Sequence, residues 1–285
     1  MSSAEAALPE LKRYRGALLR QYRGEVRLML RRRRNAILLA ALAIVPIVIG
    51  VAVKVSSPGG NDGPQFLGRI TGNGLFLVFT ALTVAIPFFL PLVIGVIAGD
   101  SIAGEAGQGT LRYLLTVPVA RGRLLTVKTM AVATFTLLAV LVVAVVGLLT
   151  GAVLFGLHSL VLLSGETVGI GNALLRTVAI VAFVAIALFG LAAGGVFIST
   201  LTENPIAAMA ATISIAIVSA LLDAVPQLSA IHPYLLTHNW LGFGELLRTS
   251  VSVTDLARWT LLHLAYAAVF LSLAWSRIST KDVTS

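Results

Sequence analysis

The sequence predicts an all-α integral membrane protein with six transmembrane helices, and three observations lead to this fold class. Hydrophobic residues make up 58% of the 285-residue chain and charged residues only 12%, a composition typical of membrane proteins. Apolar runs long enough to cross a bilayer core of about 30 Å recur along it. These runs lack the period-two alternation of a membrane β-barrel, so the expected spans are helices. They cover residues 36–53, 75–98, 130–157, 178–198, 206–222 and 259–275.

Residues 1–35 hold ten of the 21 basic residues. Apolar residues recur there at spacings of three and four while arginines form a second row, which predicts an amphipathic helix in the membrane interface. The segment is too long for a signal peptide, so we expect it to be retained. Nucleic-acid binding is the alternative interpretation of residues 31–34, but a basic cluster beside a span is more typical of the cytoplasmic side, and no nucleic-acid partner is expected. The row expected to bind the membrane surface is Arg20, Arg23, Arg27 and Arg31.

Prolines mark the first two spans. Pro46 is expected to kink the first one. The second contains Pro87 and Pro91, one turn apart, which remove backbone hydrogen bonds and bend or loosen a helix. This bend is either a hinge or a static kink filled by neighbouring side chains. Between the two spans, residues 56–74 are rich in Gly, Pro, Asn and Asp and predict an external loop.

A polar segment, residues 99–128, separates the second and third spans. Gly107 and Gly109 are expected to interrupt the helix, and the Thr110 hydroxyl can cap a new one. This new helix is short because Pro118 ends it, and a helix of about two turns is not stable alone, so its apolar face must dock on something. Its partner is either the protein's own helix ends or a separate soluble subunit. The apolar face consists of Leu111, Leu114 and Leu115.

The same segment resembles the cytoplasmic loop of type-2 ABC transporter permeases. The matching positions are Glu105, Gly109, Thr110, Leu111, Leu114, Leu115, Pro118, Val119, Arg121, Leu124, Leu125 and Lys128. In the family it resembles, this loop forms a coupling helix that meets the ATPase subunit and transmits nucleotide binding to the membrane helices. The resemblance therefore implies that Glu105, Arg121 and the residues from Gly109 to Pro118 named above form an ATPase-coupling site.

Small residues at a spacing of four occur in the third and fourth spans. Such pairs let helix backbones approach closely. They serve either packing inside one subunit, which is the commoner use, or a dimer or substrate-path face. The pairs are Gly147 with Gly151 and Gly190 with Gly194. After the fourth span, residues 199–204 predict a tight cytoplasmic turn in which Asn204 caps the fifth span and Pro205 takes its first position.

Residues 224–258, between the last two spans, are too long for a simple turn and too mixed to cross the membrane. Tyr234, Trp240 and Phe243 alternate there with prolines and glycines. Aromatic side chains favour the membrane interface, so this segment is expected to form re-entrant or interfacial helices on the outer face. Similar type-2 ABC permeases have short external helices at this place. Ser252 and Asp255 form a capping-box-like pair before the sixth span.

The placement of basic residues predicts the topology. The N-terminal segment, the polar segment and the C-terminal tail carry ten, four and two basic residues, whereas the external segments carry few and scattered ones. Both termini are therefore expected on the cytoplasmic side of the cell membrane. The chain divides into the interfacial segment 1–35 and the six-span domain 36–285.

The sequence offers little chemistry of its own. No G-x-x-x-x-G-K-[ST] motif occurs, so ATP and Mg²⁺ are expected on a partner and not on this chain. The four histidines are isolated, and neither a metal site nor a catalytic residue is predicted. The predicted span interiors carry no charged residue, whereas ion-driven carriers keep such groups at the midplane. This argues for energy supplied from outside the membrane.

With the resemblance, these features predict a permease subunit that works as a dimer with two copies of a separate ATPase. Uncharged spans fit the export of a hydrophobic or amphipathic compound. The alternative is a non-transporting membrane subunit that transmits force to envelope partners. Substrate-stimulated ATPase activity would distinguish the two, because a purely mechanical complex lacks it.

Overall fold

The computed structural model describes residues 17–56, 73–107, 121–157, 159–162 and 164–280. These residues are mostly helical, and six of their helices are long and apolar enough to cross a membrane. The predicted class, a helical membrane protein with six spans, is therefore confirmed. The helices are α1 (Ala17–Arg31), α2 (Arg33–Ser56), α4 (Leu75–Ala85), α5 (Phe89–Gly107), α7 (Arg121–Phe155), α8 (Ile170–Leu201), α9 (Pro205–Asp223) and α10 (Val253–Thr280).

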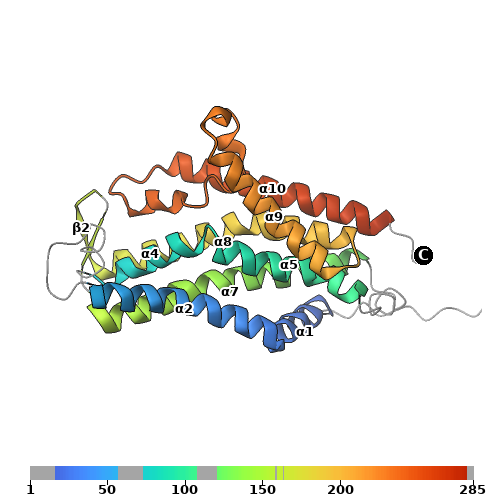
Figure 1. Cartoon of the computed structure of the whole chain (residues 1–285), viewed down its shortest axis with the longest axis horizontal. Helices are drawn as coiled ribbons and strands as arrows, with labels where there is room; N and C mark the ends of the chain where they lie inside the picture. The colour runs from blue at the N-terminus through green and yellow to red at the C-terminus, as the bar shows by residue number, and fades with distance from the viewer. Residues whose placement is uncertain (1–16, 57–72, 108–120, 158, 163, 281–285) are drawn as a thin grey trace, which may run out of the picture.

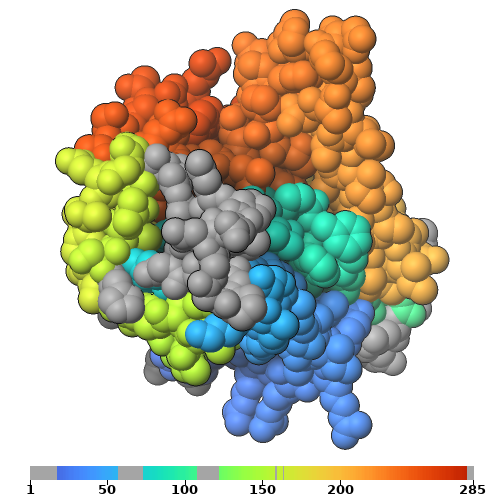
Figure 2. Space-filling view, turned by 60° about the vertical axis from the view of Figure 1, so that its left-hand side comes forward, coloured from blue at the N-terminus to red at the C-terminus, as the bar shows by residue number. Residues whose placement is uncertain are grey.

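The long helices run roughly along the longest axis of the molecule (Figure 1). At one end, here called the α1 end, α1 lies beside the end of α5 and the beginning of α7. At the other end, the cap end, lie the beginning of α4 and the segment between α9 and α10. Helix α8 is central, and most of its side chains are buried against α5, α7, α9 and α10. Viewed toward the cap end, α9 and the residues after it project beyond the rest of the bundle (Figure 2).

The second predicted span is two helices. Helix α4 ends at Ala85 and α5 begins at Phe89. The helix is therefore interrupted around Pro87, because a proline lacks the backbone N–H and its ring clashes with the preceding turn. Helix α5 continues past the predicted end of this span near residue 98 and ends at Gly107, where the sequence predicts an interruption of the helix. Its later part is held from outside: Ser199 Oγ of α8 accepts from the Ile102 and Ala103 N–H groups at 2.9 and 2.7 Å and donates to the Gly99 carbonyl at 2.7 Å.

Other predicted bounds shift in the same way. Helix α7 begins at Arg121, nine residues before the predicted third span. Helix α10 begins at Val253, inside the segment expected to precede it. The predicted cap of the fifth span is present, since Asn204 Oδ1 accepts from Ile206 N at 3.0 Å and Pro205 stands at the first helical position. A short hairpin of β1 (Leu160–Val161) and β2 (Thr167–Val168) is an addition to the predicted all-α fold.

The segment between α9 and α10, here called the cap (residues 224–252), contains three 3₁₀ helices: η1 (Pro226–Leu228), η2 (His232–Tyr234) and η3 (Gly242–Leu247). Trp240 and Phe243 are buried, while Tyr234 is exposed. Arg176 of α8 holds the cap by donating to the carbonyls of Leu246 and Arg248. The cap is thus packed onto the bundle by buried aromatic side chains and a backbone-binding arginine.

Both predicted glycine pairs lie where two helices of this chain pack closely against each other. A Cβ at Gly151 would stand 2.1 Å from the Gly74 carbonyl oxygen, and one at Gly147 would stand 3.2 Å from Val78 Cα, so this face of α7 packs on the beginning of α4. Gly190 and Gly194 face α10 through Tyr266 and Phe270 in the same way. A further pair that the sequence analysis did not single out brings α5 onto α9: Gly95 faces Ile213, and Gly99 faces the backbone of Met209.

Candidate functional site

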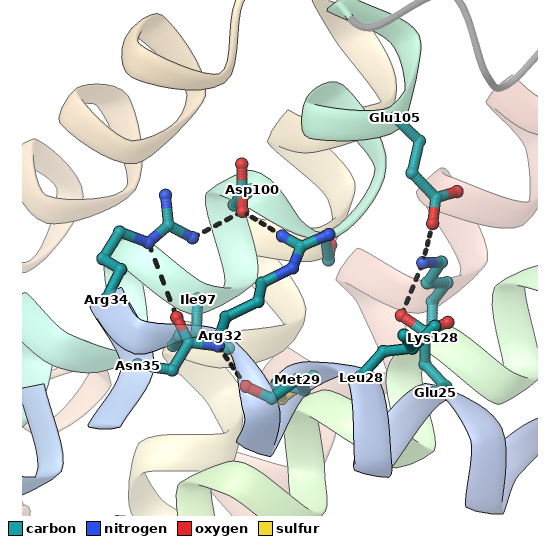
Figure 3. Close-up of a pocket in the computed structure, with 11 residues that line it drawn as sticks. Glu25, Leu28, Met29, Arg32, Arg34, Asn35, Ile97, Asp100, Glu105 and Lys128 are labelled. Atoms are coloured by element: carbon teal, nitrogen blue, oxygen red, sulfur yellow. Dashed lines mark hydrogen bonds and ion pairs between the residues drawn. The ribbon is translucent and has the colours of Figure 1, made fainter. Parts of the chain in front are cut away.

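Two clusters of ion pairs lie side by side at the α1 end of the bundle (Figure 3). The Asp100 cluster consists of Asp100, Arg32 and Arg34, and the Lys128 cluster of Lys128, Glu25 and Glu105. Their side chains come from α1, from the corner between α1 and α2, from the later turns of α5 and from the beginning of α7. The two clusters therefore connect four helices, α1, α2, α5 and α7.

In the Asp100 cluster, both arginines bind the same carboxylate oxygen. Arg32 Nη1 donates to Asp100 Oδ2 at 2.9 Å and Arg34 Nη2 at 2.5 Å. Only 10% of the Asp100 side chain is exposed, against 49% and 44% for the two arginines. Asn35 Nδ2 donates to the Met29 carbonyl at 2.8 Å, which closes the corner between α1 and α2. One buried acid thus holds two bases that reach it from the surface, and the cluster keeps a net positive charge.

The Lys128 cluster has the opposite sign. Lys128 Nζ donates to Glu25 Oε1 at 2.6 Å and also to Glu105 Oε1. Only 4% of the lysine side chain is exposed. A buried charge is tolerated only where partners compensate for lost hydration, and here α1 and α5 each supply one carboxylate. Tyr22 OH and Thr134 Oγ1, 2.6 Å apart, join α1 to α7 a little further along.

Two cavities adjoin the clusters. A small one of about 40 Å³ lies between them and is lined by residues of both. A larger one of about 280 Å³ lies beside the Lys128 cluster and has an apolar wall formed by Leu28, Leu124 and Val127. Among the described residues, no group of three His, Cys, Asp or Glu side chains is arranged to hold a metal ion. The described polar contacts at this end are mainly ion pairs between helices.

The structure describes two of the predicted coupling residues. Glu105 lies in the last turn and a half of α5 and is bound to Lys128, and Arg121 is the first residue of α7. The other predicted coupling residues lie outside the described residues: Gly109, Thr110, Leu111, Leu114, Leu115 and Pro118. The described part thus gives the two helices from which the predicted loop leaves and to which it returns.

The predicted arginine row lies on α1 as expected for an amphipathic helix. Arg20, Arg23, Arg27 and Arg31 are exposed. The opposite face, which includes Tyr22, Val26 and Met29, is partly buried, and α1 packs against α7 and α2. Its apolar stripe is therefore partly used inside the chain rather than left free for lipid.

Sequence reasoning missed most of the two clusters. It treated Arg32 and Arg34 only as a sign of topology, and it gave no role to Glu25 or Asp100. One signal was present: Asp100 directly follows an apolar run, where an isolated acid needs a partner. The identity of that partner depends on contacts between residues 66 and 68 positions apart, which no local pattern contains.

Comparison with known protein families decides what this helical bundle is. The family model described as ABC-2 family transporter protein matches residues 29–219, about two thirds of the chain. The chain belongs to the ABC-2 transporter family. This ABC-2 permease is thus a multi-pass membrane protein, as the resemblance of its polar segment predicted, and membership implies association with an ABC ATPase. No curated protein in the comparison matches it.

Proposed function

We propose that this ABC-2 permease exports a hydrophobic or amphipathic compound and that separate ATPase subunits drive it. The permease forms a homodimer that binds two ATPase copies, and ATP and Mg²⁺ are held by those copies, since this chain has no phosphate-binding motif and is not itself an enzyme. It lies in the cell membrane with both termini in the cytoplasm, and the arginine row of α1 faces anionic headgroups at the inner surface.

The observation that supports this proposal is the position of the Lys128 cluster. Residues 108–120 leave from α5 and return to α7, and Lys128 joins these two helices to each other and to α1. A force applied to the loop by an ATPase therefore reaches three helices together. Helix α5 also contacts α8 and α9, which extends the path into the middle of the bundle.

The coupling role is tested in a reconstituted complex with the cognate ATPase. Replacing Leu114 and Leu115 by serine should release the ATPase or uncouple its turnover from transport, because burying one leucine is worth about 1.5 to 3 kcal/mol. Leu261→Ser with Leu264→Ser, at exposed positions of α10, is the matched control and should keep the ATPase bound. Undiminished co-purification together with normal transport by the first variant would refute a coupling loop at this place.

Export itself has a separate test. Amphipathic compounds added to proteoliposomes should stimulate ATP hydrolysis and accumulate on the side away from the ATPase. Coupled hydrolysis that no compound stimulates would instead indicate a force-transmitting complex. Orientation is tested with tags at Gln108 and Asn61: in intact cells only the tag at Asn61 should be accessible, and the reverse would overturn the topology.

A further inference from the structure

Two imidazoles converge on one carboxylate at the cap end, far from the ion-pair clusters. Asp223 is the last residue of α9, His232 begins η2, and His238 lies in the turn that follows. His238 Nδ1 is 2.5 Å from Asp223 Oδ1, and His232 Nδ1 is 3.9 Å from the same oxygen. The two rings lie with their centroids 5.9 Å apart. Neither coupling nor packing, as described above, uses these three side chains.

The hydrogen-bond partners fix where the ring protons are. An ionised carboxylate only accepts, so His238 Nδ1 must carry the hydrogen in its contact with Asp223. His232 Nε2 is 3.1 Å from the Val225 carbonyl oxygen, which also only accepts. In the neutral ring of His232 the hydrogen is therefore on Nε2, and the Nδ1 lone pair faces Asp223. Two acceptors thus face each other at 3.9 Å, and a proton on Nδ1 would convert them into a donor and an acceptor.

Few other titratable groups surround these rings. From Pro205 to Leu241 the only further one is Tyr234, and α10 contributes Tyr266, whose hydroxyl donates to the Tyr234 carbonyl at 2.5 Å. Glu245 of η3 pairs with Arg248 at 3.4 Å. Among the described ion pairs, those of Asp223 involve the two histidines alone. The three side chains are 18 to 35% exposed, so protons from water reach them.

We propose that Asp223, His232 and His238 form a proton-binding site that joins the cap to α9. Proton uptake at His232 Nδ1 creates a charge-assisted hydrogen bond to Asp223 and draws η2 toward the end of α9. One turn earlier, Ser219 Oγ and Thr237 Oγ1 lie 2.9 Å apart, and Thr237 N donates to Ser219 Oγ at 3.2 Å. The cap is thus fixed to α9 at Ser219, and the protonated site adds a second attachment at Asp223.

The direction of the effect follows from linkage. The hydrogen bond between His232 and Asp223 exists only when His232 carries the extra proton. Acidification therefore favours the state in which the cap is attached to α9 at Asp223, as long as Asp223 remains ionised. The site responds to protons outside the cell if the cap lies on the outer face, and only this statement rests on the orientation in the proposed function.

The test observes the ring nitrogens directly. The permease alone, with ¹⁵N-labelled histidine, is placed in lipid nanodiscs with EDTA so that no metal ion competes for the rings. Its four histidines are assigned with His232→Gln and His238→Gln, and their NMR signals are followed from alkaline to acidic pH. At alkaline pH His232 should carry hydrogen on Nε2 only, and acidification should add a hydrogen-bonded Nδ1–H.

A matched pair of variants tests the role of the carboxylate. Asp223→Asn should remove the charge-assisted hydrogen bond that acidic pH creates at His232 Nδ1–H, because a neutral amide replaces the charged acceptor. Glu245→Gln, which removes another acid of the cap, should leave it unchanged. In wild-type protein with ¹³C-labelled aspartate, the new Nδ1–H should correlate with the Asp223 carboxylate, which decides the matter even if Asp223→Asn does not fold.

The proposal fails if alkaline His232 already carries hydrogen on Nδ1, if Asp223→Asn keeps the hydrogen-bonded Nδ1–H of His232 as Glu245→Gln does, or if the correlation with Asp223 is missing. These readouts use no ATPase, substrate or membrane orientation. Failure of the proton site is therefore distinguishable from failure of the proposed export function.

Discussion

The two ends of the bundle hold α7 by different means. At the α1 end, α5 and α7 are joined by the side chain of Lys128 and the carboxylates that surround it. At the cap end, α4 and α7 touch through backbone at Gly74 and Gly151. Ion pairs made by long side chains can follow a shift of a few ångströms, whereas a backbone contact is lost by a much smaller one. The backbone contact between α4 and α7 therefore tolerates less displacement than the ion pairs between α5 and α7 do.

The largest effect that sharpens this comparison is expected from Lys128→Met. This substitution leaves the carboxylates of Glu25 and Glu105 partly buried without their cation. The free energy of unfolding should fall by roughly 3 kcal/mol as a result. Thermal unfolding in detergent measures it. Lys54→Met is the control, because Lys54 is exposed, and among the described contacts its ammonium meets the Leu154 carbonyl at 3.2 Å and the Phe155 ring, 5.7 Å from the ring centroid, but no carboxylate.

A rescue variant separates charge from packing in that cluster. Replacing Glu25 and Glu105 by glutamine in the Lys128→Met background removes the stranded charges and should recover most of the lost stability. If the triple variant is as unstable as Lys128→Met alone, the cluster matters through side-chain packing rather than through charge.

The next largest effect tests the cap end. Gly151→Ala should cost about 1 to 3 kcal/mol, because its Cβ would lie 2.1 Å from a backbone oxygen that cannot move without separating α7 from α4. Gly24→Ala is the matched control: Gly24 is also helical, and a Cβ there meets nothing within 4 Å. This control should be neutral or stabilising by up to about 1 kcal/mol through helix propensity. Equal melting temperatures for the two variants would contradict the close approach.

The smallest effect concerns the Asp100 cluster. Arg34→Gln should cost about 1 kcal/mol, because Arg32 still binds Asp100 at 2.9 Å. Removing both arginines leaves a largely buried carboxylate without a cation, so the double variant should lose more than the sum of the two single ones. A thermal-unfolding double-mutant cycle measures this coupling. Strict additivity would mean that the arginines do not share the acid.

The sequence was sufficient for the class of fold because the signal is repeated: long apolar runs, separated by polar segments, fix six membrane helices whatever their neighbours are. The residues at which the helices begin and end were harder to predict from the sequence. The second span was predicted to end near residue 98, yet α5 passes through Gly99 and Gly104, which have poor helix propensity, and ends at Gly107, one of the two glycines expected to interrupt it. Close packing on α9 and the hydroxyl of Ser199 stabilise helix there, and tertiary contacts of this kind override propensity.

The candidate site was predictable only in part. The loop residues carry a pattern that points to their family, and Glu105 belongs to that pattern. Its partner in the structure, Lys128, stands in the same pattern 23 positions later, but no spacing rule states that the two meet. Glu25 reaches the same lysine from 103 positions away. Pairing across such distances is a property of the packed bundle, and it becomes visible only with coordinates.

The hydroxyl of Ser199 has a consequence for how the chain is made. It accepts from the N–H groups of α5 at Ile102 and Ala103, and Ser199 is 97 positions after Ile102. At about 5 to 20 residues per second, the ribosome needs roughly 5 to 20 seconds to add that stretch. During this interval the N–H groups of Ile102 and Ala103 are without the hydroxyl that accepts from them in the finished protein. A nascent chain that stops before α8 therefore cannot complete this part of α5, and the helix reaches its final form only after α8 has been made.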